Sequence, residues 1–428
     1  MTNQISAARP RTGRWLTWGL FAAVLLIAPH VFTGNLSITM LTQMGIAIIA
    51  CLSFNILLGQ GGMLSFGHAV YTGLGAYVAI HALNMVSGGL PLPVSLVPLV
   101  GGAAGLFFAV LLGYVTTRKS GTTFAMITLG MAELVFAMSL MFSDFFGGEA
   151  GVSGNRVAGH AVFGITFGPQ IQVYYLIALY TFVCVAAMYA FTQTPLGRML
   201  NAVRDNPERV EYVGYNAQRV RYTSFVIAGF FAGIAGGLAS ISFEIVTAEV
   251  VGSIRSGAYL LFTFLGGATF FFGPIIGAVL MVLASVLFSE FTRAWLLYLG
   301  LIFTLMVMYA PGGIASLIVM NFRVAKFGKL RALWPGYLAM AAAFLVLIVG
   351  AAAIVEMTYH LQLGSALDPK LPYLGLQLDS SRIDNWLGVL CVAVVGLALF
   401  EWRRRRFAVL WNAAQTEIEA EIKQRQSL

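Results

Sequence analysis

Long apolar runs that carry few charges recur along the chain and restrict it to a membrane environment. Hydrophobic residues make up 59% of its 428 residues and charged residues only 10%, against about 25% charged in an average soluble domain. A water-soluble fold cannot bury so much apolar surface. Five runs approach the roughly 20 residues that a helix needs to cross hydrocarbon: Trp15–Phe32, Ile38–Leu58, Val94–Val115, Tyr174–Phe191 and Leu338–Val355. The sequence therefore predicts an all-α, polytopic membrane helical bundle.

The apolar pattern predicts about ten core spans with glycine-rich broken helices, and two extra spans at the C-terminal end. One late pair is interrupted by Gly266-Gly267 and by Gly273-Pro274, so it is expected as two full spans or as a re-entrant pair. The expected spans are 15–33, 36–58, 63–83, 93–116, 122–142, 172–191, 222–242, 256–272, 276–290, 296–314, 335–356 and 386–402.

The distribution of basic residues predicts the orientation, because cytoplasmic loops are enriched in Lys and Arg. With twelve alternating spans and both termini cytoplasmic, 20 of the 25 basic residues fall on the inner side. The others are Arg156, Arg255, Arg293, Lys370 and Arg382. The net charge of +8 is thus explained by membrane orientation, and nucleic acid is not implied as a partner.

Four regions follow from this reading. We expect a cytoplasmic segment at 1–14, and we interpret the first apolar run as a retained span rather than a cleaved signal. A transmembrane core is expected at 15–320, with a cytoplasmic loop at 194–221. A basic linker and two further spans follow at 321–402, and a polar cytoplasmic tail at 403–428. The arginines at 403–406 are expected to anchor this end on anionic lipid.

The stretch QGGMLSFGHAVYTGLGAY, residues 60–77, places glycine and polar side chains between apolar runs. Its glycines allow close helix packing or a helix break beside a substrate path, and both readings stay open. Polar residues inside membranes usually face the bundle interior or a water-filled cavity. Ser65, His68 and Thr72 are spaced three and four apart and are expected on one helical face. The candidate pathway residues are Ser65, Gly67, His68, Tyr71, Thr72, Glu133, Gly266 and Gly267.

Other chemistry-bearing patterns are missing from the sequence. Glu133 is the clearest intramembrane charge, whereas ion-coupled carriers usually use several such groups. The three cysteines have no metal-ligand spacing, and no Walker A, HExxH or GxSxG motif occurs. The sequence predicts no metal, no cofactor and no enzymatic activity, so any active transport draws its energy from another chain. A second glycine series, Gly229, Gly233 and Gly237, predicts a closely packed helix face.

The cytoplasmic loop at 194–221 predicts two short helices separated by a break. Apolar residues at helical spacing precede Asp205, and Asn206-Pro207-Glu208 has the chemistry of a helix start. Gly214 is expected to end the second helix. Such an element cannot bury its apolar face alone, so it lies on lipid or on a cytoplasmic protein. Its mixed charge favours the protein.

Three ordered motifs resemble the LivM-type permeases of branched-chain amino acid ABC transporters. They are GQGGMLSFGHAVYTGLGAY, the loop and span beginning PLGRMLNAVRDNPERVEYVGY, and FLGGATFFFGPIIGA, and the resemblance covers about 36–320. It implies that Gly197, Arg198, Ala202, Arg204, Asp205, Asn206, Glu208 and Gly214 belong to an ATPase-coupling loop. Val210 and Glu211 depart from the family pattern, in which many members have alanines, and the last two spans lie outside the common core.

The resemblance also implies partners and a location. A homologous second permease (LivH-like), two cytoplasmic ATPase subunits, a periplasmic solute-binding protein and membrane lipid are expected, in a bacterial inner membrane. The leading hypothesis is a permease subunit that imports branched-chain or related amino acids. Urea, amides or other small solutes are alternative cargo. A self-sufficient carrier that uses Glu133, and an assembly subunit of a larger complex, are the other classes left open.

Overall fold

The computed structural model describes residues 11–157, 166–363, 370–373, 376–379 and 382–426. Residues 1–10 of the predicted N-terminal segment lie outside this range. The chain forms two compact units. The first comprises the chain up to Leu287 together with Phe303–Ala315, and the second comprises Phe288–Ile302 and Ser316–Leu428.

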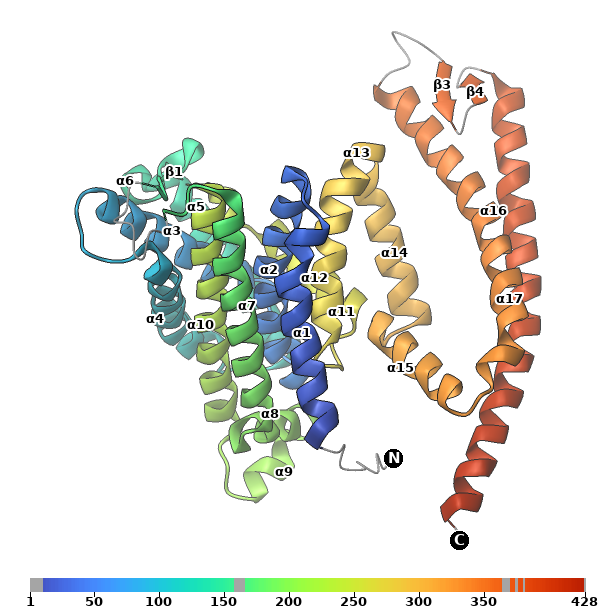
Figure 1. The fold of residues 1–428 in the computed structure, drawn as a ribbon, viewed down its shortest axis with the longest axis horizontal. Helices are drawn as coiled ribbons and strands as arrows, with labels where there is room; N and C mark the ends of the chain where they lie inside the picture. The colour runs from blue at the N-terminus through green and yellow to red at the C-terminus, as the bar shows by residue number, and fades with distance from the viewer. Residues whose placement is uncertain (1–10, 158–165, 364–369, 374–375, 380–381, 427–428) are drawn as a thin grey trace. The chain divides into compact units, whose positions relative to one another are not determined.

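The first unit holds most of the chain's helices (Figure 1). Its elements are α1 (Arg11–Val31), α2 (Asn35–Asn55), the π-helix η1 (Ile56–Gln60), α3 (His68–Ser87), η2 (Val94–Leu96), α4 (Val97–Thr116), α5 (Gly121–Met141), α6 (Ser143–Phe146), η3 (Gly148–Ala150), β1 (Val152–Ser153), α7 (Gln170–Gln193), α8 (Pro195–Asp205), α9 (Pro207–Tyr212), α10 (Ala217–Phe243), β2 (Ile245–Val246), η4 (Ala248–Val251), α11 (Ser253–Gly266), α12 (Gly273–Leu283) and the π-helix η5 (Ala284–Phe288). Strands β1 and β2 pair antiparallel.

Glycine lets three helices of this unit approach until their backbones touch. The predicted face of Gly229, Gly233 and Gly237 on α10 packs against α4, and α3 packs on the same two helices. A Cβ at Gly233 would overlap the carbonyl oxygen of Gly101, and one at Gly237 would lie 2.8 Å from Cα of Pro98. Small residues create such contacts where lipid removes the hydrophobic drive for association. The predicted close packing is confirmed here.

The number of full-length spans differs from the prediction. In the described part of the chain, eight helices are long and apolar enough to cross a membrane, or nine if α14 and α15 together make one bent span. The predicted spans at 15–33 and 276–290 correspond to shorter apolar helices, and 256–272 corresponds to the 14-residue α11. Glycine and proline interrupt the late pair of predicted spans, since Gly267 at the end of α11 has φ +113 and Pro274 opens α12.

The second unit contains the C-terminal pair of long helices. Its elements are α13 (Ser289–Phe291), α14 (Trp295–Tyr309), α15 (Gly313–Lys326), α16 (Leu330–Leu363), β3 (Lys370–Tyr373), β4 (Leu376–Asp379) and α17 (Ile383–Gln426), of which α14 and α15 extend into the first unit. Helices α16 and α17 lie side by side (Figure 1). The predicted polar tail continues the last span as one helix of 44 residues.

Replacing Gly233 by Ala is expected to lower the free energy of unfolding by about 1–3 kcal/mol, the usual cost of overpacking, because the new methyl meets backbone atoms of α4. The control is Gly257→Ala on α11, where a Cβ meets open space. The unfolding midpoints of the purified proteins in detergent provide the measurement. Equal midpoints for the two variants would contradict the close helix crossing.

Candidate functional site

A non-helical turn separates α2 from α3 and carries the first predicted motif. Helix α2 widens into the π-helix η1, and the chain then runs without regular helix from Gly61 to Gly67. Gly62 adopts φ +64, a left-handed conformation that favours glycine. Ser65 therefore lies in this turn, because α3 begins only at His68. The prediction that Ser65 shares a helical face with His68 and Thr72 is wrong.

His68 is a fully buried polar residue at the start of α3. Its Nε2 lies 2.8 Å from the hydroxyl of Ser53 on α2, and its ring meets the edge of Phe54. The ring of Tyr71 lies 6.4 Å from the imidazole, centre to centre. Nδ1 of His68 and the hydroxyl of Ser65 are buried without a hydrogen bond among the described residues. The turn thus holds two buried polar atoms with unused hydrogen-bonding capacity.

Backbone groups around His68 are held by side chains from two other helices. The amide of Ala69 donates to Ser256 Oγ on α11 at 3.0 Å, and the amide of Phe66 donates to Thr128 Oγ1 on α5 at 3.1 Å. Gly67 presses on the Thr128 backbone so closely that a Cβ would overlap its carbonyl oxygen. Side-chain hydroxyls thus satisfy amides that a helix start leaves without partners. The turn is fixed between α5 and α11.

The predicted Gly266-Gly267 break packs against the same turn. A Cβ at Gly267 would lie 2.5 Å from the carbonyl oxygen of Gly312, so this break admits only glycine-sized residues. The next residue, Ala268, places its carbonyl oxygen where a Cβ of Gly59 would stand. The structure therefore brings the first motif and the Gly-Gly break into contact at Gly59.

The loop at 194–221 forms the predicted helix–break–helix segment, here called the knuckle (residues 194–216). The hydroxyl of Thr194 accepts a hydrogen bond from the Gly197 amide at 3.2 Å and caps α8. Asn206 Oδ1 accepts one from the Arg209 amide at 3.1 Å and caps α9. Gly214 has φ +93 and follows α9. The predicted Arg198, Asp205 and Glu208 are exposed, and Ala202 is half-buried.

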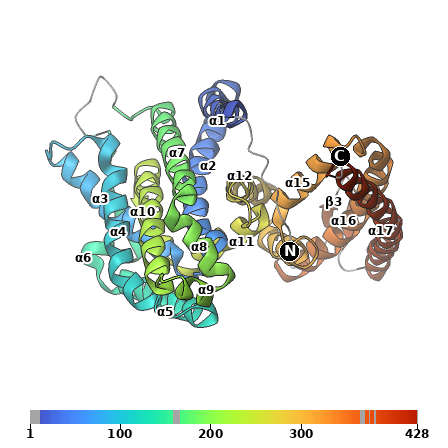
Figure 2. The ribbon, with the colours of Figure 1, turned by 90° about the horizontal axis from the view of Figure 1, so that it is seen from below.

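The knuckle is bonded directly to η1, and Arg204 also packs on Gly62 in the turn that follows. Arg204 Nη1 donates to the carbonyl oxygen of Gly59 at 2.5 Å, and Asn201 Nδ2 donates to Gln60 Oε1 at 2.9 Å. Leu200 is fully buried between them. Helix α8 lies at the ends of α7 and α10 in the same region (Figure 1 and Figure 2). Sequence reasoning missed Asn201 and Gln60, because an amide pair 141 positions apart leaves no local signal.

Glu133 does not belong to the group of buried polar residues around His68. It lies within α5, as predicted, but its side chain is exposed. The buried face of α5 carries Phe124, Thr128, Ala132 and Val135, which follow a helical repeat on the other side. The structure therefore does not place Glu133 with His68 in the interior of this chain.

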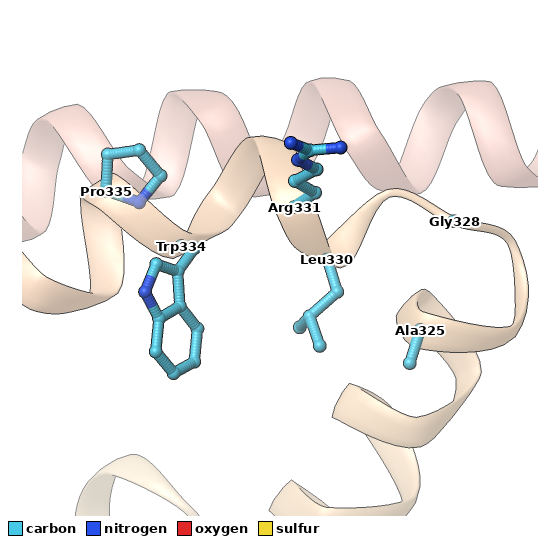
Figure 3. Close-up of a pocket in the computed structure, with 6 residues that line it drawn as sticks. All are labelled: Ala325, Gly328, Leu330, Arg331, Trp334 and Pro335. Carbon is cyan, nitrogen blue, oxygen red and sulfur yellow. The ribbon is translucent and has the colours of Figure 1, made fainter.

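A surface hollow of about 480 Å³ lies in the second unit, and its lining residues fall between Ala325 and Pro335, in and after the predicted basic linker. Figure 3 shows Leu330 and Trp334 pointing to one side and Arg331 to the other. The remaining lining residues are Ala325, Gly328 and Pro335. None of the predicted pathway residues lines this hollow.

The family comparison agrees with this arrangement, since residues 36–312 match the model of the branched-chain amino acid transport system permease component. The chain belongs to this family. The match includes the turn before α3, the knuckle and the Gly-Gly break. The family is one of transport permeases, and the chain is a multi-pass membrane protein. The second unit lies largely outside the match.

The individual proteins that resemble this chain are also named as transport permeases. The chain is 28% identical over 312 residues to the high-affinity branched-chain amino acid transport system permease protein LivM of Salmonella typhimurium, covering 68% of this chain and 72% of the relative. LivM of Escherichia coli is also 28% identical, with 69% and 74% covered. The ribose import permease protein RbsC of Haemophilus influenzae is 25% identical, with 61% and 80% covered. No solved structure gives a significant match.

Replacing Arg204 by Ala is expected to loosen the knuckle without unfolding the bundle. The lost bond to Gly59 involves a charged donor, and such bonds contribute about 1.5–3 kcal/mol. The side chain is 36% exposed, so about 1 kcal/mol is expected, which corresponds to about five-fold faster amide hydrogen exchange in α8. The control is Arg209→Ala, whose side chain is exposed. Equal exchange rates in the two variants would argue against the contact.

Proposed function

We propose that this chain is the permease subunit of an ATP-binding-cassette importer in a bacterial inner membrane, and that it moves branched-chain or related amino acids inward. The proposed partners are a homologous second permease, two cytoplasmic ATPase subunits and a periplasmic solute-binding protein. The observation that carries the proposal is the bonded contact between the knuckle and η1, which leads into the turn before α3. A movement imposed on the knuckle passes through it to the buried polar group at His68.

The tip of the knuckle has the chemistry of a protein-docking surface. Tyr212 and Val213 are 88% and 74% exposed at the end of α9, and Tyr215 is 48% exposed. Glu208 and Arg209 are exposed on the same short helix. Exposed aromatic and apolar residues rimmed by both signs of charge are typical of contact sites for another protein. A simple lipid contact would favour a basic face. We assign this tip to the ATPase and both chain termini to the same side of the membrane.

Helix α5 supports the proposal of a second permease. The exposed face of α5 carries Glu133 between Met126 and Met141, which are 73% and 77% exposed. A charged side chain at the centre of a membrane helix costs at least about 2.5 kcal/mol when it faces lipid. A second protein or a water-filled passage covering this face removes the cost. The same exposure disfavours a self-sufficient carrier, which would hold its proton-binding carboxylate inside the chain.

Two knuckle variants separate docking from transmission. Tyr212→Glu combined with Val213→Glu is expected to lose the ATPases on co-purification, together with ATP-driven uptake. Arg204→Ala is expected to retain the ATPases, while the uptake of labelled L-leucine per ATP hydrolysed in proteoliposomes falls about five-fold, the factor that corresponds to about 1 kcal/mol. Lys119→Ala, at an exposed residue outside the knuckle, serves as the control. Uptake that proceeds equally well without ATPases would overturn the proposed function.

Competition identifies the class of solute. The relative named as a ribose import permease makes a sugar a second candidate, and the sequence leaves urea and short amides as others. Excess L-leucine, ribose or urea is added to the same uptake assay with the matching binding protein. Inhibition by L-leucine alone is the expected result. Inhibition by ribose alone or by urea alone would support an importer whose solute is that compound and not a branched-chain amino acid.

A further inference from the structure

A small cavity lies within the first unit, apart from the His68 turn. Its volume is about 90 Å³, and its walls come from α2, α3, α10, α11, η4 and the α12–η5 segment. Most of its lining residues are apolar, and the polar ones are Gln43, Thr72, Arg255, Tyr259 and Ser285. Polar residues from separate helices thus converge on one space, the usual arrangement of a small-molecule site.

Thr72 supplies a buried hydroxyl beside Tyr259. The residue is 5% exposed, its Oγ1 is buried, and its side chain lies within hydrogen-bonding reach of the Tyr259 hydroxyl. Its backbone is fixed by Gly236 of α10, which approaches the Thr72 carbonyl so closely that a Cβ there would overlap it. A hydroxyl both donates and accepts hydrogen bonds, so Thr72 can bond a polar group that enters the cavity.

Arg255 makes the electrostatic potential of the cavity positive. It is the one charged residue in the cavity lining, and among the described residues it forms no ion pair. It lies in the first turn of α11, where the helix dipole adds further positive potential. Its side chain is exposed, so it lies at the entrance, whereas Thr72 and Tyr259 are buried. The site therefore favours an anionic group.

The cavity is large enough to receive a polar group of a solute. Its volume of about 90 Å³ is several times the roughly 10–15 Å³ that a cavity needs to hold one water molecule, so a carboxylate fits in it. The guanidinium fork of arginine matches a carboxylate with two parallel hydrogen bonds.

We propose that this cavity is a carboxylate subsite on the solute path, in which Arg255 pairs with the carboxylate and Thr72 donates a hydrogen bond to it. The subsite deepens the proposed function and rests on it for the identity of the solute. It selects solutes with a free carboxylate over their amides and makes a single chain competent to recognise the solute.

The experiment compares equilibrium binding of labelled L-leucine and L-leucinamide to the purified full-length chain in lipid nanodiscs. Wild type is expected to bind L-leucine at least ten-fold more tightly than L-leucinamide. Arg255→Gln abolishes this preference, Arg255→Lys retains part of it, and Thr72→Val weakens L-leucine binding several-fold. Arg293→Gln, at an exposed arginine that is not part of the cavity lining, behaves as wild type.

The outcomes separate this inference from the proposed function. Wild type that binds both compounds equally, or binds neither, overturns the subsite, as does an Arg255→Gln protein that keeps the preference. ATP-driven uptake by the complete complex is measured on the same variants. Selective binding without ATP-driven uptake would retain the subsite and reject the importer. If uptake is unchanged in Arg255→Gln and binding is not selective, the importer is retained and the subsite is rejected.

Discussion

The arrangement of the site depends on the close approach at Gly59. Its carbonyl oxygen accepts the bond from Arg204, and its Cα faces the carbonyl oxygen of Ala268 and the side chain of Asn55. Three segments far apart in the sequence therefore meet at one residue without a side chain. Because a Cβ there would overlap a backbone oxygen, the three segments hold this position only while residue 59 is glycine.

The two kinds of glycine in this chain have different consequences. Gly233 and Gly237 lie within the continuous helix α10 and lock it against α4, which makes a rigid frame. Gly62 and Gly267 have positive φ values and end helices, which leaves short breaks between rigid parts. The break at Gly62 touches Arg204 of the knuckle and leads along the chain into α3 at His68, an arrangement suited to transmit a displacement.

Local chemistry made the knuckle and the α10 face predictable from sequence. Caps such as Asn206 act on amides three residues away, and a glycine at every fourth position marks a helix face without further information. The position of Ser65 was not predictable, because it depends on where α3 begins. The contact of Arg204 with Gly59 and the presence of Arg255 and Thr72 in one cavity lining involve residues more than 140 positions apart, and only the packing of whole helices determines them.

The distribution of polar groups indicates that this chain is part of a larger assembly. His68 and Thr72 are buried within it, whereas Glu133 and the tip of the knuckle at Tyr212 are exposed. A chain that satisfied all its polar groups alone would have turned Glu133 inward, since α5 has a buried face on its other side. Lipid cannot solvate the glutamate, and the knuckle's tip cannot bury itself. Both surfaces therefore need protein or enclosed water beside them.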